Sequence, residues 1–372
     1  AYVRFRQQRG GLISEAFRAS LGSRVDGFWG HAINVLAVIS TIFGVATTLG
    51  LGTIQINSGL ARIDQMAFGV DSQLKILLGT GVVFVLAALT PLEKGVRYVS
   101  DLNMLLALLL LLFVLFLGPT DFILVAMTTT VGDYFANVLG MSLLMNPFSE
   151  GDWTERWTIF YWAWGLSWAP FVGSFIARIS RGRTIREFVV GVMGVPVALS
   201  ILWFAAFGGS ALYYEYFQGA GIADAVAQEV SSGLFATLDQ LPLSGTVTAV
   251  ALVLVVLFVV TSANSATFVL GMFTARGALN PGRWLRVTWG LIQLLVAGVL
   301  LLSGGLQALQ TISVLAAFPF MILMVFMVGS FFRSLKAERR AREEADRQWY
   351  WRVERMLEEA DAAHEERERR RL

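Results

Sequence analysis

The sequence predicts an all-α, polytopic membrane protein, and two observations lead to that prediction. Hydrophobic residues make up 56% of the 372 residues, and the mean hydropathy of the chain is +0.63. Apolar runs long enough to cross a bilayer recur along the chain, separated by polar breaks. Eight spans are expected, at 31–60, 74–92, 102–120, 155–177, 187–213, 246–274, 286–304 and 312–333.

The charged residues between the spans predict the orientation of the chain. If its first residues are cytoplasmic, the cytoplasmic connections are EKGVRYVSDLN, ARISRGRTIRE and TARGALNPGRWLR, and all three are basic. The outer connections 121–153, 214–245 and 305–311 contain no Lys or Arg. Only the first outer connection departs from the rule, with Arg62 and Lys75. Because positive residues stay on the cytoplasmic side, both ends of this chain are expected to be cytoplasmic.

The composition excludes several classes of chemistry. The chain has no Cys, which removes disulfides and thiolate chemistry, and its two histidines, His31 and His364, lie in no metal-binding motif. No HExxH, GxSxG or P-loop motif occurs. We therefore expect no enzyme and no nucleic-acid partner.

The centres of the expected spans contain no Asp, Glu, Lys or Arg. Intramembrane charges mark proton relays and ion pathways, so their absence argues against a carboxylate-driven proton pump. A cationic solute would need a buried counter-charge that these spans do not offer. A net-neutral zwitterion would not.

Aromatic side chains run through the depth of the span that contains WTIFYWAWGLSWAPF (157–171), whereas membrane proteins usually collect them at the two interfaces. Trp162 points away from the stripe and Gly165 lies on its flank. At about 100° per residue, the six that share one helix face are Trp157, Phe160, Tyr161, Trp164, Trp168 and Phe171. One interpretation is plain packing, although packing between membrane helices favours small residues. The other is a cage for a methylated ammonium, which has no N–H to donate and is bound by aromatic faces.

A faint internal repeat is the second signal. STIFGVATTLG (40–50) aligns with TSANSATFVLG (261–271), which places a hydroxyl pair over Thr261-Ser262. Transporters built from repeated halves hold ion and substrate sites at the repeat interface, and neutral hydroxyl and carbonyl oxygens suit Na⁺. Alternatively, each hydroxyl bonds the carbonyl one turn back.

The first span is rich in glycine. Gly44, Gly50 and Gly52 lie beside Thr47 and Thr48. Close helix packing and a broken helix explain these glycines equally well.

Three segments resemble a known family. WTIFYWAWGLSWAPFVGSFIARISRGRTIREF (157–188) is similar to the signature segment of the betaine/choline/carnitine transporter family. INVLAVISTIFGVATTLGLGTIQINSGL and FVVTSANSATFVLG are similar to its other recurrent stretches. The resemblance runs from residue 1 to about 335, and its aromatic segment with the basic loop is specific.

The resemblance implies a LeuT-like fold of two five-helix inverted repeats preceded by two extra helices, usually as a homotrimer in the plasma (inner) membrane. About eight of the usual twelve transmembrane helices would be present. The two extra helices and the first two of the first repeat, one of them glycine-rich, would be missing. By that template the chain holds a cytoplasmic loop or helix (1–30), the last three helices of the first repeat (31–122), an outer amphipathic helix and loop (123–152), the second repeat (153–333) and a charged cytoplasmic helix (334–372).

Two segments outside the spans have further expected roles. Residues 131–146 are apolar on one face and too polar to span, which fits an interfacial helix or an oligomer contact, and they match a helix of the family's trimer interface. The tail mixes charges at helical spacing and ends in Arg369, Arg370 and Arg371. It is either a solvated helix held by ion pairs or a sensor that docks on anionic lipid or on the cytoplasmic loops. The resemblance matches it to an osmosensing helix.

The resemblance also implies a function. Members of the family import zwitterionic compatible solutes, such as glycine betaine, ectoine or proline, by Na⁺ symport for osmoprotection. Trp164 and Trp168 match the family's substrate-box tryptophans, and Phe160 matches a gating aromatic. Gly165 stands where betaine carriers have another box Trp, which opens one side of the cage and favours a bulkier solute.

The sodium ligands are carried over in the same way. Thr261 and Ser262 match the side-chain ligands of one sodium site, and Thr41 and Phe171 match parts of a second. Val45 stands where the second site has a Thr, which puts that site and a stoichiometry of two Na⁺ in doubt.

Two alternatives stay open. The first is a sodium-independent exchanger of carnitine or choline type, although such exchangers lose the hydroxyl pair that this chain keeps at Thr261-Ser262. The second is a truncated membrane protein that does not transport but senses osmotic state or assembles with a partner.

Overall fold

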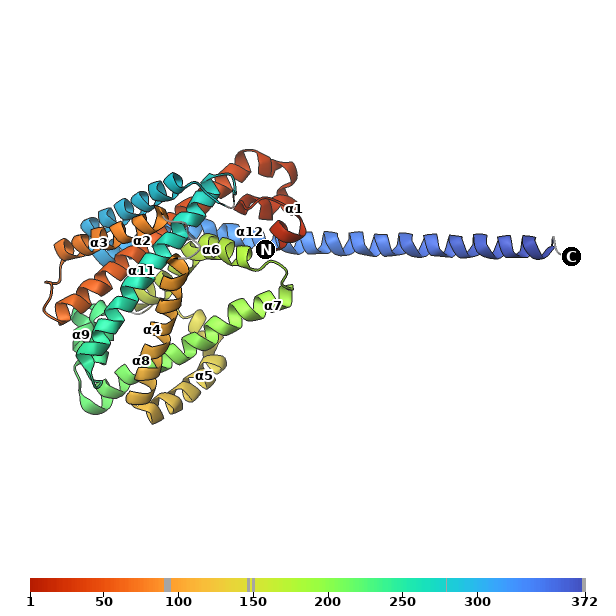
Figure 1. Cartoon of the computed structure of the whole chain (residues 1–372). Coiled ribbons are helices and arrows are strands. Elements are labelled where there is room, and N and C mark those ends of the chain that lie inside the picture. The colour runs from red at the N-terminus through yellow and green to blue at the C-terminus, as the bar shows by residue number, and fades with distance from the viewer. Residues whose placement is uncertain (90–94, 146–147, 149–150, 279, 370–372) are drawn as a thin grey trace. The chain divides into compact units, whose positions relative to one another are not determined.

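The computed structural model describes residues 1–89, 95–145, 148, 151–278 and 280–369, and these residues form helices and turns without a strand (Figure 1). Four short helices are α1 (Arg18–Leu21), α7 (Ile185–Val189), α9 (Ile222–Gln228) and α10 (Gly233–Leu238). The long helices are α2 (Phe28–Arg62), α3 (Val70–Leu89), α4 (Gly95–Leu117), α5 (Thr120–Ser142), α6 (Phe160–Ile179), α8 (Val195–Gln218), α11 (Ser244–Thr274) and α12 (Arg283–Arg369). The helical fold class expected from the sequence is confirmed.

Seven of the described helical segments are long and apolar enough to cross a membrane, where the sequence predicted eight spans. Two predicted spans, 286–304 and 312–333, both fall within the single helix α12. The helix α6 is not among the seven, because its Trp, Tyr, Gly and Ser residues lower its hydropathy. Conversely, α5 is among them. The helix predicted over 131–146 begins at Thr120, eleven residues earlier than expected. The apolar residues added at this end make the helix long enough to cross a membrane.

A glycine pair divides α12. Gly304 is extended (φ 174°), and Gly305 has a left-handed φ of 53°, a conformation that glycine adopts without steric cost. The helix is therefore interrupted between the two spans predicted on either side of these residues.

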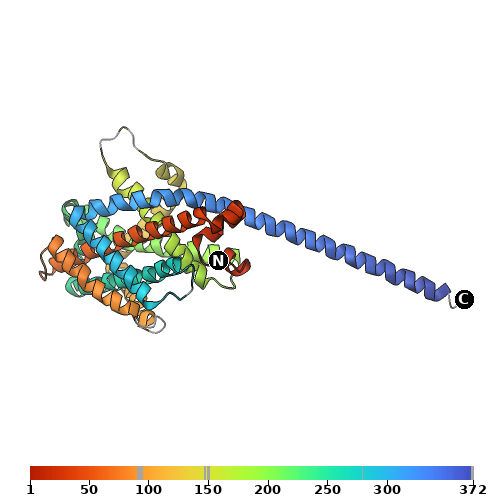
Figure 2. The same cartoon turned by 90° about the horizontal axis from the view of Figure 1, so that it is seen from above.

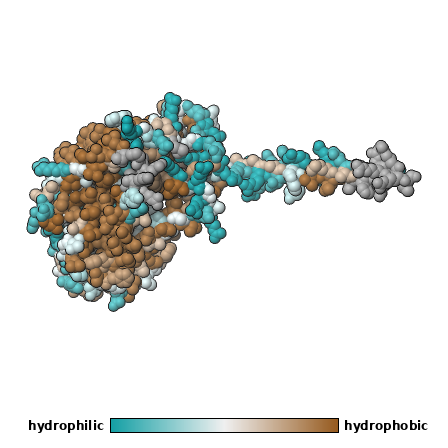
Figure 3. All heavy atoms as spheres, viewed as in Figure 1, coloured by the Kyte–Doolittle hydropathy of each residue, from teal (hydrophilic) through white to brown (hydrophobic). Residues whose placement is uncertain are grey.

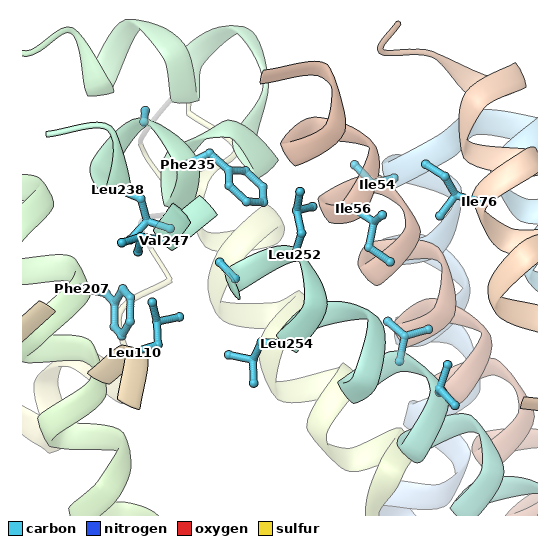
Figure 4. Close-up of a cluster of buried hydrophobic side chains, with 14 of the residues drawn as sticks. Ile54, Ile56, Ile76, Leu110, Phe207, Phe235, Leu238, Val247, Leu252 and Leu254 are labelled. Atoms are coloured by element: carbon cyan, nitrogen blue, oxygen red, sulfur yellow. The ribbon is translucent and has the colours of Figure 1, made fainter. Parts of the chain in front are cut away.

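The chain separates into two compact units, one formed by residues 1–13 and 34–321, the other by 14–33 and 322–372. In the first unit, Phe235 of α10 and Leu252 of α11 lie against α2, where Ile54 and Ile56 belong to the same buried cluster (Figure 4). A large apolar core thus joins helices that are far apart in sequence.

The second unit contains local ion pairs within each of its two segments. Arg18 bonds Glu15 and Asp26, which raises the pKa of the Arg18 guanidinium. In the tail, Arg339 pairs with Glu343 one turn on. The two residues of this pair have the spacing expected for ion pairs on a solvated helix. Arg370 and Arg371 lie outside the described residues.

Glycines of α2 give close helix packing rather than a broken helix. A side chain at Gly52 would collide with Val259 of α11, and one at Gly50 would collide with Leu309 of α12. The helix itself continues from Phe28 to Arg62. Gly50 of α2 thus lies beside Leu309 of α12, and Figure 2 shows α2 (red to orange) and this stretch of α12 (blue) running side by side.

Candidate functional site

The aromatic stripe begins in a π-helical turn, Thr154–Ile159, and continues along α6. Its rings form a continuous series. Phe160 stacks on Trp164 with ring centroids 5.9 Å apart, Trp164 meets Trp168 edge to face at 6.3 Å, and Trp168 meets Phe171 at 5.5 Å. Trp157 stacks in the same way on Tyr161. Each ring fixes the next, so the spacing of the stripe is preorganised.

The two central tryptophans are tied to α2 by their indole N–H groups. Trp168 Nε1 donates to the Gly44 carbonyl and the Thr48 hydroxyl, both at 3.0 Å, and Trp164 Nε1 reaches the same two oxygens at 3.3 Å. A side chain at Gly44 would collide with Ser167. Glycine is therefore needed at this point of α2 for α6 to approach closely enough for these bonds.

Both residues that lie beside the stripe, Trp162 and Gly165, are exposed. Trp162 is 64% exposed on the opposite side of α6, as its helical position predicts. Gly165 is also exposed, and a Cβ added there would meet no atom within 4 Å. The space beside Trp164 is open, as expected from a glycine on the flank of the stripe.

The hydroxyl pair lies on α11. Thr261 donates to the Leu257 carbonyl one turn back at 2.7 Å, which is the local interpretation left open by the sequence. This bond uses the hydroxyl proton only, so the lone pairs of Thr261 Oγ1 can still bind a cation. Ser262 is half-buried beside it.

Contacts with α2 set the depth of this pair. Gly52 lies against Val259, and Gly59 lies against Leu252, seven residues along α2 and seven residues back along α11. The two helices are therefore antiparallel and in register here. Ser262, three residues beyond Val259, is by this register level with Leu49 of α2.

The tryptophans and the hydroxyl pair thus lie at a similar level along α2. Thr48 bonds both indoles, and the next residue, Leu49, is level with Ser262. Two elements that are far apart in sequence, α6 and α11, each contact this part of α2. The sequence missed the anchoring roles of Gly44 and Thr48, although their spacing of four residues on one helix face was a signal for a shared partner.

The second sodium site is assigned to residues that lie closer to the N-terminal end of α2 than Leu49 does, or that pack there. Thr41 is buried and donates to the Ala37 carbonyl at 2.8 Å. Val45, one turn on, is buried in the cluster that also contains Phe171. Thr41 is eight residues from Leu49, or about 12 Å along the helix. The structure therefore brings Phe171 near Val45, at a different depth from Ser262.

These features define a multi-pass, all-helical membrane protein in which α2 bonds the tryptophans of α6 and packs against α11, the helix that carries the hydroxyl pair. The family model described as BCCT, betaine/carnitine/choline family transporter, matches residues 1–340. The chain belongs to this family, which is consistent with the inverted-repeat architecture expected from the sequence.

Three similar proteins are transporters of small solutes. The chain is 45% identical to the glycine betaine transporter OpuD of Bacillus subtilis (strain 168) over 349 residues, covering 93% of this chain and 68% of the relative. It is 41% identical to the ectoine/hydroxyectoine transporter of Virgibacillus pantothenticus, covering 93% and 69%. It is 39% identical to the high-affinity choline transport protein of Escherichia coli (strain K12), covering 93% of this chain and 52% of that protein. These relatives are transporters rather than enzymes.

Proposed function

We propose that this protein is a secondary active transporter that imports a zwitterionic quaternary-ammonium or related compatible solute by Na⁺ symport for osmoprotection. The single observation that supports it most is the orientation of Trp164 and Trp168. Their N–H groups are committed to Gly44 and Thr48, and Phe160 stacks on Trp164, so what these rings can still offer is the π face that no neighbouring ring covers. A π face attracts a methylated ammonium by about 0.5–2 kcal/mol and needs no hydrogen from it.

The coupling ion would be held at the hydroxyl pair. Na⁺ bound by Thr261 and Ser262 would bridge α11 to the facing stretch of α2, and α2 in turn holds both tryptophans. Binding of the ion would therefore stabilise the arrangement in which the solute meets the rings. Rocking of the repeats would then expose both ligands to the other side of the membrane.

The choice of solute depends on the open flank at Gly165. The named relatives carry glycine betaine, ectoine and hydroxyectoine, or choline. We propose a solute of the glycine betaine, ectoine or proline class, because a neutral zwitterion needs no charged residue at the centre of a span. Space beside Trp164 favours the bulkier of these.

The assembly and placement of the protein follow from the family. We propose a homotrimer in the plasma (inner) membrane, with both ends of this chain in the cytoplasm and the tail near anionic lipid. The basic connections and the ion-paired tail support this orientation.

The test is uptake of labelled glycine betaine and labelled ectoine by cells that lack their own osmolyte carriers and express the gene for this chain. Uptake is expected in Na⁺ medium and not after Na⁺ is replaced by K⁺. Equal uptake in both media would select the sodium-independent exchanger. No uptake in either medium would favour the non-transporting protein.

A further inference from the structure

Two buried amide side chains that the proposed mechanism does not use have polar atoms without a hydrogen-bond partner among the residues that the structure describes. Gln293, in the first span of α12, is 0% exposed, and both its Nε2 and its Oε1 are unpaired. Asn264 of α11 is 2% exposed, and its Oδ1 is unpaired. Such groups are rare in proteins, because each one loses its bonds to water without gaining others.

The register of α11 and α12 places the two amides opposite each other. A Cβ at Gly271 would lie 3.7 Å from Arg286 Cγ, and one at Gly290 would lie 3.5 Å from Thr267 Cγ2. A step of four residues back along α11, from Gly271 to Thr267, thus corresponds to a step of four residues forward along α12, from Arg286 to Gly290. The two helices are therefore antiparallel and in register. Three more residues in each direction, about 4.5 Å, lead to Asn264 and Gln293.

The unpaired atoms identify the ligand that would suit this place. Two are carbonyl acceptors, Asn264 Oδ1 and Gln293 Oε1, and one is a donor group, Gln293 Nε2. A cation would suit the two oxygens but would leave the NH₂ group beside a positive charge. Water donates two hydrogens and accepts two, so it satisfies all three atoms.

We propose that Asn264 and Gln293 form a buried hydration site that holds ordered water between α11 and α12. Thr267, whose hydroxyl donates to the backbone carbonyl of Asn264 at 2.7 Å, closes the site on the side of Gly290. The site lies one helical turn from Thr261, toward the end of α11 that carries Thr274. An ion that leaves the hydroxyl pair in that direction would meet water rather than hydrocarbon. This last role rests on the proposed sodium coupling, whereas the site itself does not.

Radiolytic footprinting of the purified protein tests for the water directly, in Na⁺-free buffer made with ¹⁸O-labelled water. Phe84 is fully buried and lies next to Gly290, so hydroxyl radicals reach it only from water bound nearby. Phe84 should take up the label, and buried Phe235 should not. The label at Phe84 should fall at least threefold in the double variant Gln293→Met, Asn264→Leu. An unlabelled Phe84, or an unchanged label in the double variant, would overturn the proposal.

A double-mutant cycle of melting temperatures tests whether the two amides share the site. The shift caused by both substitutions should be smaller than the two single shifts combined, because either single change leaves an orphaned amide. Thr248→Val is the control, because Thr248 Oγ1 is also buried and unpaired among the described residues but lies about 24 Å from Asn264 along α11. Its shift in melting temperature should therefore add to that of Gln293→Met. Additive shifts for the two amides would exclude a shared site. Coupling seen only in Na⁺ would replace water by a cation, and coupling without label at Phe84 would indicate a direct amide pair.

Because the footprinting and melting measurements need neither Na⁺ nor uptake, they can succeed where the transport test fails. The reverse outcome, Na⁺-dependent uptake with no label at Phe84, would reject the hydration site and leave the proposed transport intact.

Discussion

The helices α11 and α8 are both apolar enough to span a membrane, yet they are used differently. In the most apolar window of α11, 44% of the residues are buried within the protein, whereas none are in the most apolar window of Ile185–Gln218, and α8 buries residues such as Phe207 and Tyr214 only toward its later end. The neighbouring α5 resembles α8, with 6% buried. Figure 3 shows how much of one face of the molecule is covered by hydrophobic residues. Hydropathy alone identifies segments that avoid water, but it does not distinguish a helix packed on other helices from one whose apolar side chains face outward.

The largest expected effect comes from filling a helix contact in the packed region. Gly52→Leu on α2 should lower the melting temperature in detergent by many degrees and abolish uptake, because the new side chain would collide with Val259. Overpacking of this kind costs on the order of 1–3 kcal/mol or more. Gly208→Leu on α8 is the matched control, since a Cβ there meets nothing within 4 Å. If both variants melt alike, the contrast between the two regions is wrong.

The next effect concerns the two faces of α6. Trp168→Leu should weaken solute binding by roughly tenfold or more, because it removes a π face worth up to about 2 kcal/mol. Trp162→Leu should be mild, since Trp162 is exposed on the other side of the helix. Isothermal titration with glycine betaine and with ectoine measures both. Equal losses in the two variants would show that the stripe serves packing and not recognition.

A smaller effect is expected from the hydroxyls. Thr261→Val should raise the Na⁺ concentration for half-maximal uptake several-fold, as the loss of a ligand worth about 1 kcal/mol predicts. Thr128→Val on exposed α5 is the control, because Thr128 bonds the carbonyl one turn back in the same way as Thr261 but faces outward. An unchanged Na⁺ dependence for Thr261→Val would show that the bond to Leu257 is the whole role of this hydroxyl.

The smallest effect on folding is expected at the open flank of the stripe. Gly165→Trp places its Cβ in open space at an exposed position and should leave the melting temperature within a few degrees of the original. It should change the ratio of ectoine to glycine betaine uptake in favour of the smaller solute. Competition uptake at fixed label measures the ratio, and an unchanged ratio would mean that Gly165 does not border the solute.

Sequence patterns predicted local features well because a helix has a fixed period. The shared face of Phe160, Trp164 and Trp168 follows from 3.6 residues per turn, and the structure places these rings in one series. The same rule placed Trp162 outside. The upstream end of α5 was missed because the polar residues of 131–146 outweighed the apolar turns that precede them.

The sequence by itself determined the membrane class, most of the spans, the aromatic stripe and the resemblance to the transporter family, since each depends on composition or on spacing along one segment. Only the tertiary structure decided that the indole N–H groups of Trp164 and Trp168 bond Gly44 and Thr48, and that Ser262 lies at the same level of α2. It also decided which glycines are helix contacts and which face open space. The physical reason is that register between helices is set by the fit of many side chains at once, and no single segment contains that information.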